Sequence, residues 1–151
     1  MKRLSGHAET VCDASAASVS ELLRAVDRYP DWHGELVRRV AVRERDADGY
    51  PAKVDARLHV AIGPVRHDLE LTLAVAAERP DSISLTRLPN DAEDREAFVA
   101  VWRVDEHRRT TIRLSLEAEL EVPRLLPLGD LGHRLVTGFV EAAAAAAELG
   151  R

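Results

Sequence analysis

One histidine and two arginines in strand-like segments are the residues of this chain best suited to chemistry. His67 lies on the otherwise apolar parity of residues 65–75, and an imidazole can exchange a proton near neutral pH. The pattern predicts either acid–base or hydrogen-bonding chemistry at His67, or a partly hydrated histidine at the end of a sheet. Arg87 and Arg103 can pair with a carboxylate or an enolate, unless they lie on the solvent face as strand arginines usually do.

Other patterns that support catalysis or metal binding are missing from the sequence. There is no nucleophile-elbow motif and no glycine-rich phosphate loop. Three glutamates on one strand parity, at 117, 119 and 121, predict a solvated surface rather than paired catalytic carboxylates. No two histidines are four residues apart and none clusters with the cysteine, so we expect no metal site and no cofactor. The histidines are His7, His33, His59, His67, His107 and His133.

Aromatic residues make up only 4% of the chain, yet the short stretch DRYPDWHGEL (27–36) contains both a tyrosine and a tryptophan. Large rings bury much area, so Tyr29 and Trp32 predict either a lid at one end of a cavity or a plug at the small end of the core. Trp102 shares its strand parity with Phe98. It either lines a cavity or packs beneath a helix.

Hydrophobic periodicity predicts the elements that must position these side chains. Residues 7–13 form a first strand, and residues 15–26 form a short amphipathic helix with Ser15 or Ser18 as its N-cap. Pro30 breaks the helical segment that follows, and a glycine four residues later ends it.

The rest of the chain is predicted to be a meander of strands followed by one long helix. The helix runs from Pro127 to a stop at Gly150, with apolar residues at helical spacing. The strand 97–104 alternates little, so we expect it to be covered on both faces. The strands joined by short turns are expected near residues 40–45, 53–62, 65–75, 83–85, 97–104 and 112–121.

These elements predict an α+β fold. A seven-stranded antiparallel sheet with one apolar face needs a cover, and the C-terminal helix is the only element long enough to supply it. We therefore expect a curved sheet wrapped on that helix, with two short helices between the first and second strands. Such a sheet leaves a hollow between itself and the helix.

Composition narrows the class of partner. A net charge of −5 and a pI near 5.7 argue against nucleic acid and against an anionic membrane. The start MKRLSGHAET has no apolar run, and no stretch approaches a membrane span. A lone cysteine, Cys12, fits a reducing cytoplasm. We expect a single cytoplasmic domain over 1–151, bacterial by its Ala-, Arg- and Val-rich composition, and either monomeric or homodimeric.

The order of elements resembles the START-like superfamily, also called SRPBCC or helix-grip, from about residue 9 to residue 149. The resemblance rests on TVCDASAASVSELLRAV, DRYPDW, VAVRERDADG and FVAVWRVDEHRRTTIRLSLEAEL in that order. The superfamily includes polyketide cyclase/dehydrase and lipid-transport families, and DRYPDW is similar to its coenzyme Q-binding branch. The resemblance implies a ligand cavity between sheet and helix, with residues 29–34 near its mouth.

The predicted function is binding of a hydrophobic small molecule such as a lipid, a quinone or a polyketide-like compound. The inward parity of the two central strands carries one polar residue, His67, whereas cyclases of this superfamily place several polar residues in the pocket. Two alternatives stay open: a polyketide cyclase/aromatase using His67, and a scaffold with a filled core. The candidate ligand-binding residues are Tyr29, Trp32, Leu58, Val60, His67, Leu69, Leu71, Trp102, Leu135 and Phe139.

Overall fold

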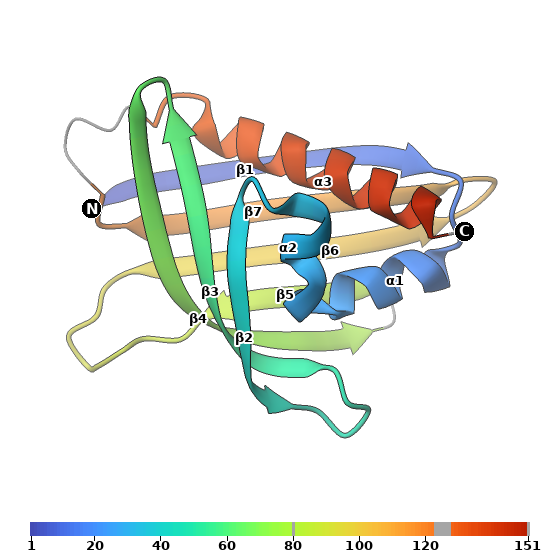
Figure 1. Cartoon of the computed structure of the whole chain (residues 1–151), viewed down its shortest axis with the longest axis horizontal. Helices are drawn as coiled ribbons and strands as arrows, with labels where there is room; N and C mark the ends of the chain where they lie inside the picture. The colour runs from blue at the N-terminus through green and yellow to red at the C-terminus, as the bar shows by residue number, and fades with distance from the viewer. Residues whose placement is uncertain (80, 123–127, 151) are drawn as a thin grey trace.

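The computed structural model describes residues 1–79, 81–122 and 128–150, and it confirms the α+β fold (Figure 1). Short helices lie between the first two strands, and a long helix ends the chain. In chain order the elements are β1 (Lys2–Cys12), α1 (Ala16–Arg24), a short 3-10 turn η1 (Val26–Arg28), α2 (Tyr29–His33), β2 (Val37–Arg45), β3 (Pro51–Ile62), β4 (Val65–Arg79), β5 (Ser82–Arg87), β6 (Ala97–Glu106), β7 (Thr110–Leu120) and α3 (Leu131–Leu149).

All seven strands form one antiparallel sheet in the order β1-β7-β6-β5-β4-β3-β2. The N-terminal strand pairs with β7 along its whole length, so the first and last strands of the chain lie side by side. Figure 1 shows β2, β3 and β4 rising steeply across the direction of β1 and β7, so the sheet is strongly curved. The curve wraps its apolar face around α3, as the periodicity predicts.

The long helix α3 lies along β1, and two glycines set how closely it approaches. A Cβ atom on Gly132 would overlap the carbonyl oxygen of Ser5, and one on Gly6 would lie 2.6 Å from the carbonyl oxygen of Gly132. Only residues without side chains allow this contact between backbones. The first turn of α3 is therefore held against the β1 edge of the sheet, away from β3.

The core between sheet and helices is closed by α1 and the turn after it. Ser15 caps α1 by accepting a hydrogen bond from the Ser18 amide, 3.1 Å long. The Tyr29 hydroxyl donates to the Leu23 carbonyl at 2.6 Å and so ties α2 to the end of α1. Cys12 is completely buried in this core.

Several predicted boundaries and one predicted face were wrong. The first strand begins at residue 2, and α1 ends at Arg24 because the chain tightens into η1. The long helix begins at Leu131, while Pro127 lies outside the described residues. Strand β6 alternates after all: Val99 is 38% exposed and Trp102 is fully buried, so its outer face meets solvent.

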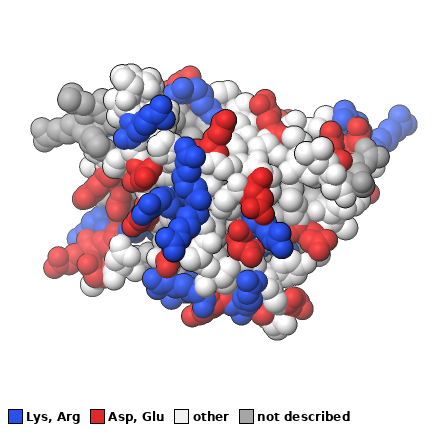
Figure 2. Space-filling view, viewed as in Figure 1, with Lys and Arg blue, Asp and Glu red and all other residues white. Residues whose placement is uncertain are grey.

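The outer face of the curved sheet is polar. Figure 2 shows acidic and basic side chains interspersed over this view of the molecule. On β3, Asp55 pairs with Arg43 and Arg57 pairs with Glu70. None of the described helices is long and apolar enough to cross a membrane.

Candidate functional site

An apolar cavity of about 80 Å³ lies between the inner face of the sheet and α3. All seven strands supply its floor, because every second residue along a strand points to the inner face of the sheet. Helix α3 supplies its roof through Leu131, Leu135, Val136 and Phe139. The cavity persists because α3 is held against β1 and does not fill the concave side of β3 and β4.

Most of the predicted ligand-binding residues border this cavity, and two do not. Leu71 lies on the inward face of β4 but is packed within the core. The alternation along a strand predicts which face a side chain is on, but it does not predict which part of that face borders an empty space. Trp32 lies on α2 outside the cavity wall. The candidates that do border it are Tyr29, Leu58, Val60, His67, Leu69, Trp102, Leu135 and Phe139.

The aromatic side chains meet around Phe139. The ring centroid of Phe139 lies 5.6 Å from that of Tyr29, 5.6 Å from that of Trp32 and 5.2 Å from that of Trp102. Tyr29 and Trp102 border the cavity, whereas Trp32 does not. Trp32 contacts Phe139 and Tyr29, and its ring centroid lies 4.9 Å from that of Tyr29. The lid role of Tyr29 and Trp32 stays a prediction.

Tyr29 can contact a ligand in the cavity through its ring, but its hydroxyl cannot act as an acid there. Its hydroxyl is already donated to the Leu23 carbonyl. Burial raises the pKa of Tyr29 far above its ordinary value, against an opposing hydrogen bond with Trp102. The phenol therefore stays protonated at any physiological pH.

His67 and Lys2 bring the polar groups that reach the cavity wall. His67 faces Val60 across the β3–β4 pair, near the turn that joins these strands. Lys2 enters the wall from the first residue of β1, and the sequence missed it because the strand was predicted to start five residues later. Apart from Tyr29, these two are the ionisable residues among the described residues that border the cavity.

The two arginines proposed as anion partners do not reach the cavity. Arg103 is exposed on the outer face of β6, which is the solvent-facing alternative that the sequence left open. Arg87 is turned inward, and its side chain is only 3% exposed, but Asp94 accepts from it at 2.6 and 3.0 Å. Arg87 also donates to the Glu96 carbonyl at 3.0 Å.

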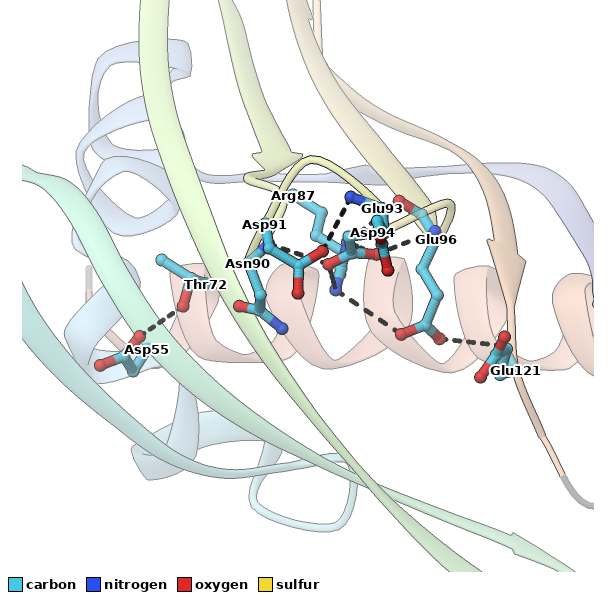
Figure 3. A network of polar contacts seen from close by, with 9 residues as sticks. All are labelled: Asp55, Thr72, Arg87, Asn90, Asp91, Glu93, Asp94, Glu96 and Glu121. Carbon is cyan, nitrogen blue, oxygen red and sulfur yellow. Dashed lines mark hydrogen bonds and ion pairs between the residues drawn. The ribbon is translucent and has the colours of Figure 1, made fainter.

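The Arg87 contacts organise the loop between β5 and β6 (Figure 3). The hydrogen bonds from Arg87 hold the pKa of Asp94 well below its usual range. Glu96 accepts from the Glu121 amide at 2.8 Å and so links the loop to the residue after β7. These contacts fix the conformation of the loop. They also pair the Arg87 guanidinium with Asp94 and Glu96, so its charge is already neutralised within the protein.

No metal site is formed by the part of the chain that the structure describes. Groups of three or more His, Cys, Asp or Glu side chains in ligating positions are absent from residues 1–79, 81–122 and 128–150. The cavity lining is suited to burial of apolar surface, and His67 and Lys2 lie on the described wall beside these apolar residues.

Comparison with known proteins identifies the fold through solved structures. Neither the protein-family models nor the curated proteins match this chain. A START superfamily protein from Mycobacterium smegmatis matches with a TM-score of 0.64 and 20% identity, over 98% of this chain and 95% of the other. The Zhui aromatase/cyclase from Streptomyces matches with a TM-score of 0.64 and 17% identity, over 97% and 94%.

A plant protein shares the same architecture. The major latex-like protein from Panax ginseng matches with a TM-score of 0.59 and 11% identity, over 96% of this chain and 94% of the other. Because each match spans nearly the full chain, the resemblance to START/SRPBCC proteins is confirmed at the level of fold. The chain has the helix-grip fold of that superfamily.

Proposed function

We propose that this chain, as a single domain, binds a hydrophobic small molecule in the cavity between the sheet and α3. The observation that carries the proposal is the lining: aliphatic and aromatic side chains from seven strands and two helices face a space that the core leaves unfilled. Burying apolar ligand surface there is worth about 25 cal/mol per Å² before the costs of binding. A lipid, a quinone or a polyketide-like compound fits this lining.

The cavity has to grow to take such a ligand. Its volume of about 80 Å³ is smaller than the roughly 300 Å³ at which typical ligand pockets begin. Phe139 and Leu135 form part of the roof, and we expect these side chains to rotate when a ligand enters. We therefore expect ligand binding to be accompanied by repacking of the aromatic residues around Phe139.

A polyketide cyclase/aromatase activity is the second candidate. One observation favours it: His67 borders the cavity in a chain whose fold matches that of the Zhui aromatase/cyclase. In this case His67 would move protons on a bound polyketide chain. The scarcity of other polar groups on the described wall favours binding over catalysis.

The location that fits this function is the bacterial cytoplasm. Cys12 is buried and is the only cysteine of the chain, so it needs no oxidising compartment. A net charge of −5 supports a small-molecule partner over nucleic acid.

The proposal is tested by filling the cavity. Ala100 borders it from β6, and the next residue, Val101, points to the other face of the same strand. Ala100→Leu is expected to weaken binding of the fluorescent probe N-phenyl-1-naphthylamine by about tenfold or more, since the new side chain takes the ligand's place. Val101→Leu is the matched control and should bind as the original protein does. Equal binding by both variants would place the probe elsewhere and refute the proposal.

A further inference from the structure

A hollow of about 400 Å³ lies on the outer face of the sheet, on the opposite side from the cavity. Its walls come from β2, β3, β4 and the loop between β5 and β6. Three arginines line it, Arg39, Arg43 and Arg57, and Asn90 borders it from the loop. Its volume lies within the range of typical small-molecule sites, which begin at roughly 300 Å³.

The two carboxylates of this outer hollow are already paired. Asp55 accepts from Nε of Arg43 at 2.5 Å and from the Thr72 hydroxyl at 2.7 Å. Glu70 accepts from Nε of Arg57 at 3.1 Å. Because a guanidinium has five N–H donors, both arginines keep donors that these contacts do not use. The acids therefore neutralise two of the three arginines and leave their remaining donors facing the hollow.

Arg39 is the surplus cation of the hollow. Its side chain is exposed and forms no ion pair or hydrogen bond within the part of the chain that the structure describes. It lies directly opposite Arg57 in the β2–β3 register, and like charges in such cross-strand positions destabilise a sheet. An anion bound between the two guanidinium groups would relieve this repulsion.

The β5–β6 loop holds Asn90 in a fixed position at the hollow. The backbone amide of Asn90 donates to Asp94 at 2.9 Å, and Asp94 is held by the buried Arg87. The Leu88 amide donates to the Thr72 carbonyl at 2.8 Å and ties the start of the loop to β4. Figure 3 shows Asn90 beside Thr72. The side-chain amide of Asn90 has no hydrogen-bond partner among the described residues, so it can donate to a ligand.

The surface around the hollow is basic, although the chain as a whole is acidic. Strands β2 and β3 carry six basic and two acidic residues, whereas the whole chain has 21 Lys and Arg against 26 Asp and Glu. Figure 2 shows basic side chains gathered over β2. A local excess of positive charge raises the concentration of anions beside it.

We propose that this outer hollow binds a small organic anion whose charge lies on oxygen atoms, a carboxylate or a phosphate ester. Arg39 and Arg57 hold the charged oxygens through their N–H donors, and Asn90 donates a further hydrogen bond. The site lies on the opposite face of the sheet from the cavity, so the inference does not rest on the ligand proposed there. The protein then has one apolar and one anion-binding site.

Three probes that share a phenyl ring test this: benzoate, phenylphosphate and the neutral benzamide, each titrated by NMR of the backbone amide and arginine Nε–Hε groups. Both anions are expected to shift the resonances of Arg39 and Arg57 with saturation, and the tighter of the two identifies the charged group. Benzamide should leave these resonances in place. Arg39→Gln should weaken binding of the tighter anion about tenfold, followed at Arg57.

Arg38→Gln is the matched control, because Arg38 is an exposed neighbour on β2 that does not line the hollow. This variant loses the same charge and should bind the anion as the original protein does. Equal weakening by Arg38→Gln and Arg39→Gln overturns the inference, because the arginines would then supply only a diffuse charge that protects the sheet edge. Binding of benzamide as tight as that of the anions also overturns it.

A second variant leaves the charge of the hollow unchanged. Asn90 is exposed, so Asn90→Ala removes the side-chain amide without disturbing the core. It should weaken anion binding by about threefold and leave binding of N-phenyl-1-naphthylamine and the thermal unfolding midpoint unchanged. Anions that shift neither Arg39 nor Arg57 in the original protein overturn the inference and leave the function proposed for the cavity untouched.

Discussion

Phe139 is the side chain on which the cavity roof depends. It contacts the rings of Tyr29, Trp32 and Trp102, and it borders the cavity from α3. The aromatic stretch 27–36 therefore acts together with a residue more than a hundred positions away. The sequence predicted each ring as a candidate, but not that they converge on Phe139.

Phe139→Ala is expected to destabilise the protein and to widen its ligand range. Loss of this partly buried ring, which packs against the core, is expected to cost up to about 3 kcal/mol, measured as the free energy of unfolding in urea. The space that is freed should let N-phenyl-1-naphthylamine bind more tightly relative to naphthalene. Val99→Ala, on the exposed face of β6, should change neither quantity. Unchanged selectivity in Phe139→Ala would show that this ring does not limit the cavity.

His67 separates the two candidate functions. If the site only binds apolar molecules, His67→Leu removes an imidazole that must be desolvated, and affinity for N-phenyl-1-naphthylamine should rise by about threefold. A cyclase would instead lose turnover of a poly-β-keto substrate in the same variant. Measured turnover in the original protein that disappears in His67→Leu would make the enzyme the better description.

At the scale of elements, the placement of α3 follows from its contact with β1. Gly132→Ala is expected to cost about 1–3 kcal/mol in the free energy of unfolding, because the added Cβ would overlap the Ser5 carbonyl oxygen. Gly138→Ala is a matched control on the same helix, where a Cβ meets nothing within 4 Å. It should stabilise the protein by about 0.5–1 kcal/mol through helix propensity. Equal effects in the two variants would contradict the role of the contact.

The β5–β6 loop should respond to acid through Asp94. Its pKa is lower in the folded protein than in the unfolded chain, so the stability it contributes is complete above about pH 4 and is lost as pH falls below that value. Asp94→Asn should lower the thermal unfolding midpoint at pH 7 by several degrees and flatten its decline between pH 5 and pH 3. Asp91→Asn is the control, because Asp91 lies in the same loop and its side chain accepts a hydrogen bond from the Glu93 amide. A decline as steep in Asp94→Asn as in the original protein would rule out this contribution.

At the scale of the whole molecule, local patterns predicted most of the fold because each strand buries one face. Leu58, Val60, His67 and Leu69 border the cavity as their parity predicts. Three features depend on contacts between distant residues and were not predictable in this way. The partner of Arg87 comes from the following loop, the roof position is set by Gly6 and Gly132, and the last residues of β3 lie beyond the start of β2, which pairs with β3 only from Leu58 back.

The most direct test of ligand binding in the cavity is an NMR measurement of intermolecular nuclear Overhauser effects, with methyl-labelled protein and N-phenyl-1-naphthylamine. The cavity binder proposed here should show contacts from the probe to the methyl groups of Leu69, Leu114 and Leu135, which border the cavity from β4, β7 and α3. Contacts confined to the exposed methyl groups of Val11 and Val99 would contradict it, because the probe would then sit on the outside of the sheet.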